Sequence, residues 1–556
     1  MMLSFNTRTA RGGFLLAVAW LWALLPEGRA AAPTAREGAA TESRAATRAA
    51  LDVLRTGGNA VDAAVAAAFV AGVVSPSSSG LGGGGFALVR RAADTRPFVL
   101  DFRESAPAAL DAAAFEARPF ADNERARATG VPGELSGLAE LHQRFGKRKW
   151  AELVRPAAQW AESGFLVEGH LASVLASPPS QLLRSDSGLA DLYFKAGKPA
   201  VVGARLRNPK LAKSLRRIAN EGARSLYEGP LGVDLVAAAR AKGGALDLAD
   251  LKAYRPKERA PLRVSWEGYE VYSMPPPSAG GLLLAQVLGL FSSAELKKLG
   301  LGSGAYQHIL AEAMRGSLSD RMRYVGDPEF ATVNVEALLQ PARLSARKRA
   351  MAYDRTHTPP RFGLEQGGTH HLVVADREGN VVSLSTTINS AFGAKLSGAE
   401  SGIVLNDQLT DFTAKKDVLP FGLDESPNRA RPGARPVSSM TPTIVTRAGR
   451  PVLVLGGSGG TTIPLNVTQV LLARLVFDLG AQEALKAPRF FVPTSGATLR
   501  VDAGTAQALL DDLRWRGEIV EHKRSDATAV QLIAFGADGQ IESAADPRKL
   551  GSGETR

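Results

Sequence analysis

Apolar residues recur at intervals of three and four in "SRAATRAALDVLR" and then occupy almost every position of "AVDAAVAAAFVAGVV". The first spacing predicts an amphipathic helix that ends at Gly57-Gly58. The second predicts a helix that is buried on all sides from Val61 to Val74, with Asn59 as its N-cap. The early part of the chain is therefore expected to contribute buried helices.

Short apolar runs predict strands before a long helical section. The glycine-rich "SSSGLGGGG" leads into the strands "FALVRR" and "FVLDFRE"; it matches neither phosphate-binding pattern, so close backbone packing is the prediction. The section to about residue 336 has helical spacing, as in "AYQHILAEAMRGSLSDRMRY". Residues 340–368 lose this spacing and contain five arginines and Pro359-Pro360, which predicts a connector or a processed tail.

The pattern alternates from Thr369 onward, with "HLVVAD", a turn at "REGN" and "VVSLSTTI", and this predicts a β-hairpin. The simplest pairing of the two strands places Thr369 opposite Ile388, and a one-residue change in the loop places Thr387 there instead. In both registers Thr387, Ile388 and Asn389 flank Thr369 in space.

Thr369 follows two glycines, and its position raises the possibility of a nucleophile. A hydroxyl nucleophile needs a base within hydrogen-bond reach, and a threonine at a new chain end carries one, because its α-amine titrates near pH ~8. The Gly368-Thr369 bond is therefore predicted to be a self-cleavage bond, with glycine giving the backbone the freedom that an N-to-O acyl shift demands. The alternative is that a threonine simply opens a strand, as its β-propensity favours.

Composition makes the chain globular, with 556 residues of which 45% are hydrophobic and 22% charged. A basic start followed by the apolar run "FLLAVAWLWALL" predicts a signal peptide over about residues 1–30, because the run is too short to span a bilayer; an uncleaved anchor is the alternative. The chain has no cysteine, which excludes a lipoprotein anchor and thiol chemistry. A periplasmic or secreted protein without a membrane anchor is expected.

The net charge of +12 is spread along the chain, and no nucleic-acid-binding motif accompanies it, so a solvated basic surface is predicted rather than a nucleic-acid partner. Adjacent His370 and His371 point to opposite faces of a strand and no matching ligand set exists, so no metal site is predicted.

Many stretches resemble the γ-glutamyltranspeptidases (glutathione hydrolases), a family of N-terminal-nucleophile hydrolases, in order and spacing. They include "DFRESAP", "GVPGELSG", "MPPPSAGG", "GGTHHLVVADREGNVVSLSTTINSAFG", "ESGIVLNDQLTDF", "RPVSSMTPTIV" and "GGSGG". The resemblance implies an α+β fold, a stacked αββα sandwich with a largely helical middle section. It also implies a large subunit, residues 31–368, and a small subunit, residues 369–556, which pair as a heterodimer after self-cleavage and need no metal or organic cofactor.

The resemblance also assigns roles to residues. The catalytic set would be Thr369 as nucleophile, Thr387 as a second hydroxyl that positions it, and the backbone N–H groups of Gly459 and Gly460 for the oxyanion. The γ-glutamyl group would be held by Arg103, Ser438 and Ser439 at its carboxylate and by Asn389, Gln408 and Asp411 at its ammonium. Taken singly, each has a structural alternative: a strand-end ion pair for Arg103, turn or helix caps for Asn389 and Asp411, and a strand-to-helix turn for the glycines.

Three departures from the family pattern concern the acceptor side. His370 stands where many members carry a second threonine, "GGSGG" replaces Gly-Ser-Pro-Gly-Gly, and Phe421 lies near the place of an aromatic lid residue. The choice between hydrolysis by water and transfer to an amine stays open.

The predicted function is an exported γ-glutamyl hydrolase or transferase that acts on glutathione and related compounds through a γ-glutamyl-threonine ester. The alternatives are a glutaryl or cephalosporin acylase of the same family and a non-catalytic secreted binding protein that keeps the fold.

Overall fold

Two stacked β-sheets carry the fold in the computed structural model, which describes residues 36–117, 122–356, 368–419, 422–492, 498–502, 504–522 and 528–556. The first sheet has seven strands, in the order β20 (Ser552–Thr555), β1 (Gly38–Thr41), β11 (Thr369–Ala375), β12 (Val381–Thr387), β2 (Gly84–Arg90), β3 (Phe98–Phe102) and β8 (Lys257–Arg259). The second has six, in the order β19 (Ile541–Ala545), β18 (Ala529–Phe535), β14 (Arg450–Ser458), β13 (Thr443–Arg447), β10 (Tyr269–Ser273) and β9 (Leu262–Trp266).

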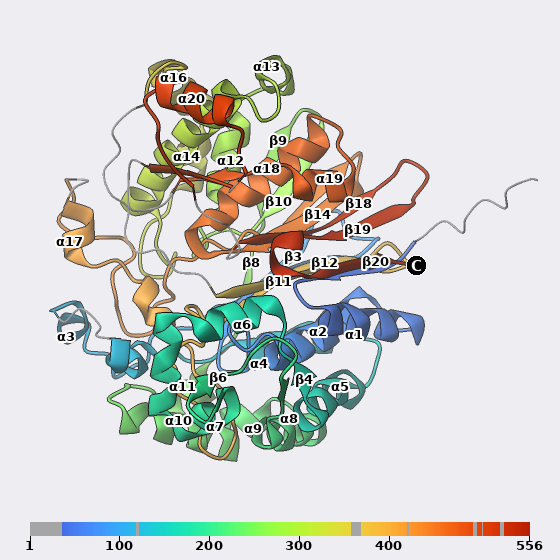
Figure 1. The fold of residues 1–556 in the computed structure, drawn as a ribbon, viewed down its shortest axis with the longest axis vertical. Helices are drawn as coiled ribbons and strands as arrows, with labels where there is room; N and C mark the ends of the chain where they lie inside the picture. The colour runs from blue at the N-terminus through green and yellow to red at the C-terminus, as the bar shows by residue number, and fades with distance from the viewer. Residues whose placement is uncertain are drawn as a thin grey trace, which may run out of the picture. The chain divides into compact units, whose positions relative to one another are not determined.

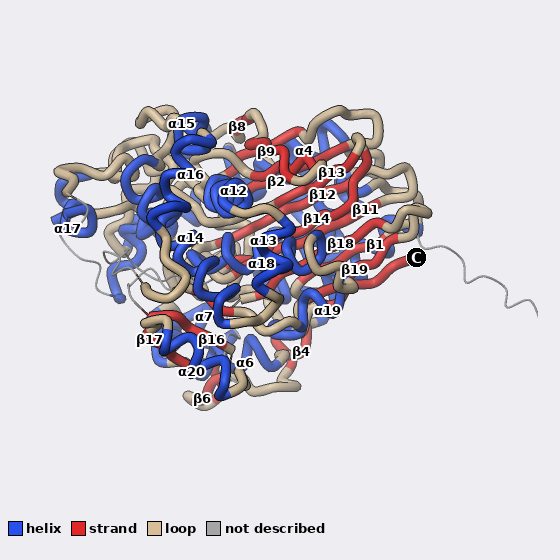
Figure 2. Tube along the Cα trace, turned by 90° about the horizontal axis from the view of Figure 1, so that it is seen from above, coloured by secondary structure: helices blue, strands red, loops and turns tan. Residues whose placement is uncertain are grey.

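Helices cover the outer face of each sheet, so the layers run helix, sheet, sheet, helix (Figure 1). Against the first sheet lie α2 (Ala60–Val74) and α4 (Glu134–Phe145), with α1 (Arg44–Arg55), α5 (Trp150–Ser163) and α8 (Pro209–Glu221) packed around them. Against the second lie α12 (Gly280–Leu290) and α18 (Ile463–Leu475), with α14 (Gly304–Tyr324) on α12. Figure 2 shows the strands of the two sheets stacked over one another. The predicted αββα architecture is confirmed.

Strand β11 lies inside this stack and shows how the layers share their cores. Leu372 and Val374 face the helical layer of α2, whereas Val373 and Ala375 face the second sheet. All seven residues of the strand are buried. A strand that is buried on both faces has a nearly continuous apolar sequence. In β11 this apolar run follows the two histidines.

The remaining elements are short. The helices are α3 (Ala112–Ala117), α6 (Gly169–Ala176), α7 (Ser187–Tyr193), α9 (Arg224–Tyr227), α10 (Pro230–Ala241), α11 (Leu248–Ala253), α13 (Ser293–Leu299), α15 (Val335–Leu339), α16 (Pro341–Ala350), α17 (Lys415–Val418), α19 (Ala481–Lys486) and α20 (Gln507–Trp515). The small sheets comprise β4 (Phe165–Leu166) with β7 (Arg205–Leu206), β5 (Phe194–Lys195) with β6 (Lys198–Pro199), and β15 (Phe490–Phe491), β16 (Thr498–Val501) and β17 (Ile519–His522). The helical middle section predicted from the sequence is present.

The first two predicted helices form as expected. The Asn59 side chain accepts hydrogen bonds from the backbone N–H groups of Val61 and Asp62, and the Asp62 carboxylate accepts one from the Asn59 N–H, which makes a capping box. Helix α2 is buried along almost its whole length because it lies between the first sheet and α5.

The β11–β12 hairpin settles which of the two registers applies. Thr369 lies opposite Thr387 and Ala375 opposite Val381, so the simplest pairing is wrong by one residue. The reason is the loop: the Asn380 side-chain amide donates to the Asp376 carboxylate, and Gly379 takes a positive φ of 84°. The loop between the paired strands is therefore one residue longer than the simplest pairing predicts, because it includes Asp376.

The expectation of a connector over residues 340–368 is wrong for its first part, which is helix α16. Ion pairs rather than an apolar stripe hold this helix, because Arg343 and Arg347 both bond to Asp320 and only Leu344 is buried. Apolar periodicity could therefore not reveal it. Pro359-Pro360, the predicted signal peptide and Phe421 lie outside the described residues.

No helix in the described part of the chain combines the length and the apolar character that crossing a bilayer requires.

The end of β3 is fixed by a buried carboxylate. Asp101 is fully buried, and its two oxygens lie 2.7 Å from the Arg435 guanidinium and 2.9 Å from that of Arg259. The Arg103 N–H also donates to Asp101, at 2.9 Å. Replacing Asp101 would remove the nearest counter-charge of both guanidinium groups, and for Arg259 it would leave Asp327 at 3.8 Å and Glu329 at 3.7 Å.

We predict that Asp101→Asn lowers the free energy of unfolding by about 3–5 kcal/mol, because the buried Arg435 guanidinium loses its ion-pair partner and Arg259 keeps only the more distant Asp327 and Glu329. Denaturant melts of the purified protein measure the change. Asp52→Asn, on the exposed face of α1, is the matched control and is expected to change stability by less than about 0.5 kcal/mol. Equal melts for the two variants would contradict the prediction.

Candidate active site

One pocket gathers nearly all the residues predicted for catalysis and substrate binding. Its wall is formed where β3, β11 and β12 end, by the 3-10 turn Gln408–Asp411, by the segment 438–440 and by the turn that leads into α18. The predicted residues in the wall are Arg103, Thr369, Thr387, Asn389, Gln408, Asp411, Ser438, Ser439 and Gly460. Of the ten predicted residues, only Gly459 is not part of the wall.

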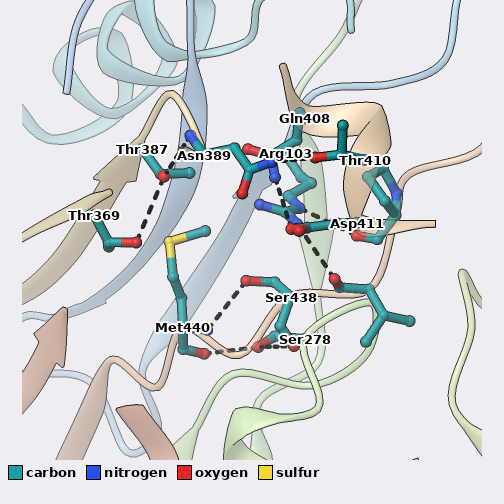
Figure 3. Close-up of polar contacts among 12 residues, drawn as sticks. Arg103, Ser278, Thr369, Thr387, Asn389, Gln408, Thr410, Asp411, Ser438 and Met440 are labelled. Atoms are coloured by element: carbon teal, nitrogen blue, oxygen red, sulfur yellow. Dashed lines mark hydrogen bonds and ion pairs between the residues drawn. The ribbon is translucent and has the colours of Figure 1, made fainter. Parts of the chain in front are cut away.

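The two threonines are joined at the start of the hairpin (Figure 3). The Thr369 hydroxyl donates to the Thr387 hydroxyl over 3.5 Å, and the Thr387 hydroxyl donates to the Gly368 carbonyl over 2.6 Å. The Asn389 N–H donates to the same Thr387 oxygen at 2.9 Å, which fixes that hydroxyl's direction. Thr387 therefore polarises the carbonyl that precedes Thr369.

Gly368 has a steric requirement besides the conformational freedom expected from the sequence. A Cβ at this position would lie 2.1 Å from the Asn389 carbonyl oxygen, far inside van der Waals contact. Asn389 is itself in the left-handed region, with φ 74°. Its side-chain amide donates to the Asp407 carbonyl and the Thr410 hydroxyl, and these bonds hold the unusual backbone. The tight approach keeps the Gly368-Thr369 bond against β12.

The other end of the pocket is built around one ion pair. The Arg103 guanidinium, itself 1% exposed, lies 2.6 Å from the Asp411 carboxylate and also donates to the Pro436 and Val437 carbonyls. The Gln408 amide donates to the same Asp411 oxygen at 2.7 Å. Burial raises the pKa of Asp411, and the charge and hydrogen bond of Arg103 lower it. Arg103 thus forms an ion pair at the end of β3, and its partner is another predicted binding residue.

The serine pair lies on the segment that closes this end. The Ser438 hydroxyl accepts from the Met440 N–H at 3.0 Å, and the Ser278 hydroxyl donates to the Met440 carbonyl at 2.6 Å. The Ala279 N–H donates to the Ser438 carbonyl at 2.9 Å. These bonds fix the segment backbone, so that Ser438 and Ser439 both line the pocket.

The two glycines after β14 lie at the entrance to α18. Both take positive φ, 127° for Gly459 and 62° for Gly460, which favours glycine at these positions. The Gly459 carbonyl accepts from the Thr462 hydroxyl at 2.9 Å. The turn is therefore a strand-to-helix connection, as the structural alternative states, and Gly460 brings it to the pocket.

Sequence reasoning missed a buried cluster behind Thr369. The Lys549 ammonium lies 3.0 Å from the Glu42 carboxylate, 2.7 Å from the Ser458 hydroxyl and 3.5 Å from the Thr369 carbonyl. Glu42 and Lys549 are 507 positions apart, and no local pattern links them. Arg321 and Thr410 in the pocket wall were also missed, because no role was assigned to either residue although both lie in stretches that resemble the family.

The two histidines after Thr369 are fully buried. Burial lowers the pKa of His370 to about 4 and that of His371 to about 3, so both imidazoles are neutral at pH 7. The Nδ1 of His371 lies 2.7 Å from the Ser385 hydroxyl. Within the described ranges, His, Asp and Glu side chains form no group of three that could hold a metal ion.

The class of protein follows from this arrangement: a stacked αββα fold of the N-terminal-nucleophile hydrolase type, with a threonine at the first position of a central strand. The γ-glutamyltranspeptidase family model matches residues 46–555, and the chain belongs to that family.

Several relatives place the chain within the family. It is 35% identical over 520 residues to the glutathione hydrolase proenzyme of Escherichia coli, covering 91% of this chain and 89% of that one. It is equally 35% identical over 516 residues to the acylase ACY 1 proenzyme of a Pseudomonas species, covering 90% of each. The crystal structure of cephalosporin acylase from Bacillus halodurans superposes with a TM-score of 0.84 at 26% identity, covering 97% of this chain and 99% of that one. Both enzyme types are thus similar to this protein.

A second buried carboxyl group lies next to Arg103. Burial raises the pKa of Glu104 to about 8, the charge of Arg103 opposes this shift, and that of Asp411 adds to it. Glu104 is therefore neutral at pH 7. Because its pKa is higher in the folded protein than the ordinary 4.5, its contribution to stability is complete below about pH 4.5 and is lost as the pH rises through 8.

We predict that Glu104→Gln, which keeps the shape and removes the ionisation, flattens the dependence of stability on pH between 5 and 9. Wild type is expected to lose up to about 5 kcal/mol more than the variant over this window. Melts of both proteins at half-unit pH steps measure the difference, and all other titrating groups cancel in it. Parallel curves would show that Glu104 does not titrate in this window.

Proposed function

We propose that this protein is a self-processed γ-glutamyl hydrolase or transferase that acts on glutathione and related γ-glutamyl compounds. The observation that carries the proposal is the single pocket with Thr369 and Thr387 at one end and Arg103, Gln408 and Asp411 at the other (Figure 3). A γ-glutamyl group has a reactive carbonyl at one end and an ammonium with a carboxylate at the other. The pocket offers complementary groups at both ends.

Self-processing would begin in the uncut chain, in which the Thr387 hydroxyl donates a hydrogen bond to the Gly368 carbonyl. The Thr369 oxygen attacks the Gly368 carbonyl carbon, and the bond from Thr387 stabilises the oxyanion that forms there. The C–N bond then breaks, its nitrogen takes the hydroxyl proton, and water hydrolyses the resulting ester. The products are a large subunit that ends at Gly368 and a small subunit that begins at Thr369, and the two remain paired.

Turnover would use the new α-amine of Thr369 as base. It takes the hydroxyl proton as the oxygen attacks the γ-amide carbonyl, and it returns the proton to the leaving amine. Backbone N–H groups of Gly459 and Gly460 would stabilise the tetrahedral oxyanion, and a γ-glutamyl-threonine ester results. Water or an acceptor amine then releases the γ-glutamyl group. These steps draw on no metal or organic cofactor.

The substrate's amino-acid end would be held by charge. Arg103 would bind the carboxylate with Ser438 and Ser439, and Asp411 would bind the ammonium with Asn389 and Gln408. The basic and apolar start of the chain supports export, with the periplasm or the external medium as the place of action.

A glutaryl or cephalosporin acylase is the second candidate, which the likeness to two acylases favours. A glutaryl group has the carboxylate but lacks the ammonium, so it would leave Asp411 without a cationic ligand. The retained Asp411 and Gln408 therefore support the γ-glutamyl assignment. A non-catalytic binding protein is less consistent with the hydrogen-bonded threonine pair.

We predict that purified wild-type protein splits between Gly368 and Thr369 and that Thr369→Ala stays whole, because alanine has no hydroxyl to attack. Denaturing gels with intact-mass analysis detect the split, and release of p-nitroaniline from γ-glutamyl-p-nitroanilide reports turnover. Thr56→Ala, at the exposed end of α1, is the control and should split and turn over like wild type. A wild-type chain that stays whole and inert would favour the binding-protein alternative.

We predict that Asp411→Asn raises KM for γ-glutamyl-p-nitroanilide about tenfold to a hundredfold, because a charged hydrogen bond to the substrate ammonium is lost. Glutaryl-p-nitroanilide has no ammonium, so any turnover of it should not weaken. Initial rates with the two anilides test this. Wild type that prefers the glutaryl anilide would instead identify an acylase.

A further inference from the structure

The proposed mechanism assigns no role to one arginine in the pocket wall, Arg321. Arg321 lies in the last turn of α14 and lines the pocket together with Met322. Its neighbour Asp320 is already bonded to Arg343 and Arg347 of α16. Among the described residues, the Arg321 side chain has no hydrogen-bond or ion-pair partner.

Arg321 lies in the same pocket wall as Arg103 and Asp411, and it interacts with both charges. Burial lowers the pKa of its guanidinium, the charge of Asp411 raises it, and the charge of Arg103 lowers it further. Asp411 in turn has its pKa lowered by Arg321. The other acid of the described pocket wall, Asp417, forms no ion pair with Arg321. The Arg321 charge therefore repels the Arg103 guanidinium and attracts the Asp411 carboxylate.

A partly buried cation without a partner is unfavourable, and an ordinary structural role explains it poorly. A basic residue in the last turn of a helix can stabilise the helix dipole, but Arg323 does this for α14 from outside the pocket. The end of the pocket thus has two guanidinium groups, Arg103 and Arg321, and one carboxylate, Asp411. A ligand that brings a carboxylate would offset the surplus positive charge.

We propose that Arg321 is a second carboxylate-recognition residue of this pocket, so that the protein selects acyl groups with a free carboxylate at the end remote from the scissile amide. Arg103 is already bonded to Asp411, and a bound carboxylate must share Arg103 with it. Arg321 supplies the additional positive charge that makes this sharing favourable. The proposal rests on the proposed function where it concerns turnover. The binding of a free carboxylate by Arg321 does not depend on that function.

The test compares two anilides that differ only in the carboxylate: γ-glutamyl-p-nitroanilide and 4-aminobutyryl-p-nitroanilide. Arg321→Met is expected to raise KM for the first about tenfold to a hundredfold, to change kcat by less than about threefold, and to leave kcat/KM for the second unchanged. Arg321→Lys should recover part of the affinity, since it restores the charge but not the planar fork. Arg323→Met, which removes a cation from the same helix turn, is the matched control.

Two results on the anilides would overturn the proposal: unchanged KM in Arg321→Met, or equal losses on both anilides, which a distorted pocket would produce. A titration of L-glutamate by calorimetry needs no turnover and separates this proposal from the function itself. Wild type that fails to cleave the γ-glutamyl anilide refutes the function, yet glutamate binding at least tenfold weaker in Arg321→Met still supports the role of Arg321. Equal affinities, or no saturable glutamate binding by wild type, overturn it.

Discussion

The hydrogen bond from the Thr387 hydroxyl to the Gly368 carbonyl depends on the register of β11 against β12, and the proposed self-cleavage depends on that bond. Because side chains alternate along a strand, a slip of one residue would move Thr387 to the opposite face. The register is held by the turn at Asp376–Asn380 and by the two different cores on either side of β11. The apolar residues that pack on both faces of β11 thus fix the position of the Thr387 hydroxyl.

The end of the pocket around Arg103 and Asp411 is held by a largely buried ion pair rather than by the register of two strands. Burial raises the pKa of Asp411 above its ordinary value, and the charges of Arg103 and Arg321 oppose that shift. Burial likewise raises the pKa of Glu104, to about 8, against the opposing charge of Arg103. Of these two carboxyl groups, Asp411 is the one that forms the 2.6 Å ion pair with Arg103 in the pocket wall.

Local signals predicted individual elements: alternation marked β11 and β12, and Asn59 marked the start of α2. The layered architecture and the roles of Arg103, Asp411 and Ser438 came from the resemblance to the family. What the local signals could not predict depends on contacts between distant segments. Helix α16 is held by ion pairs to Asp320, the Lys549–Glu42 pair joins opposite ends of the chain, and the loop that sets the hairpin register is decided by one side-chain amide. The resemblance added roles that spacing alone left open.

The pocket has two ends that different segments of the chain form, and the chain is similar both to glutathione hydrolases and to acylases. The reacting end is made by β11, β12 and the turn before α18, whereas the amino-acid end is made by the end of β3, the turn Gln408–Asp411 and the segment at Ser438. Under the proposed function, substitutions at the second set would alter which acyl group is held without moving the threonine. Specificity is then set by the charges around Asp411, because one extra cation or one missing anion changes the balance that a head group must match. In this chain the balance includes Arg321, so a carboxylate on the head group is the feature that the pocket is best equipped to recognise.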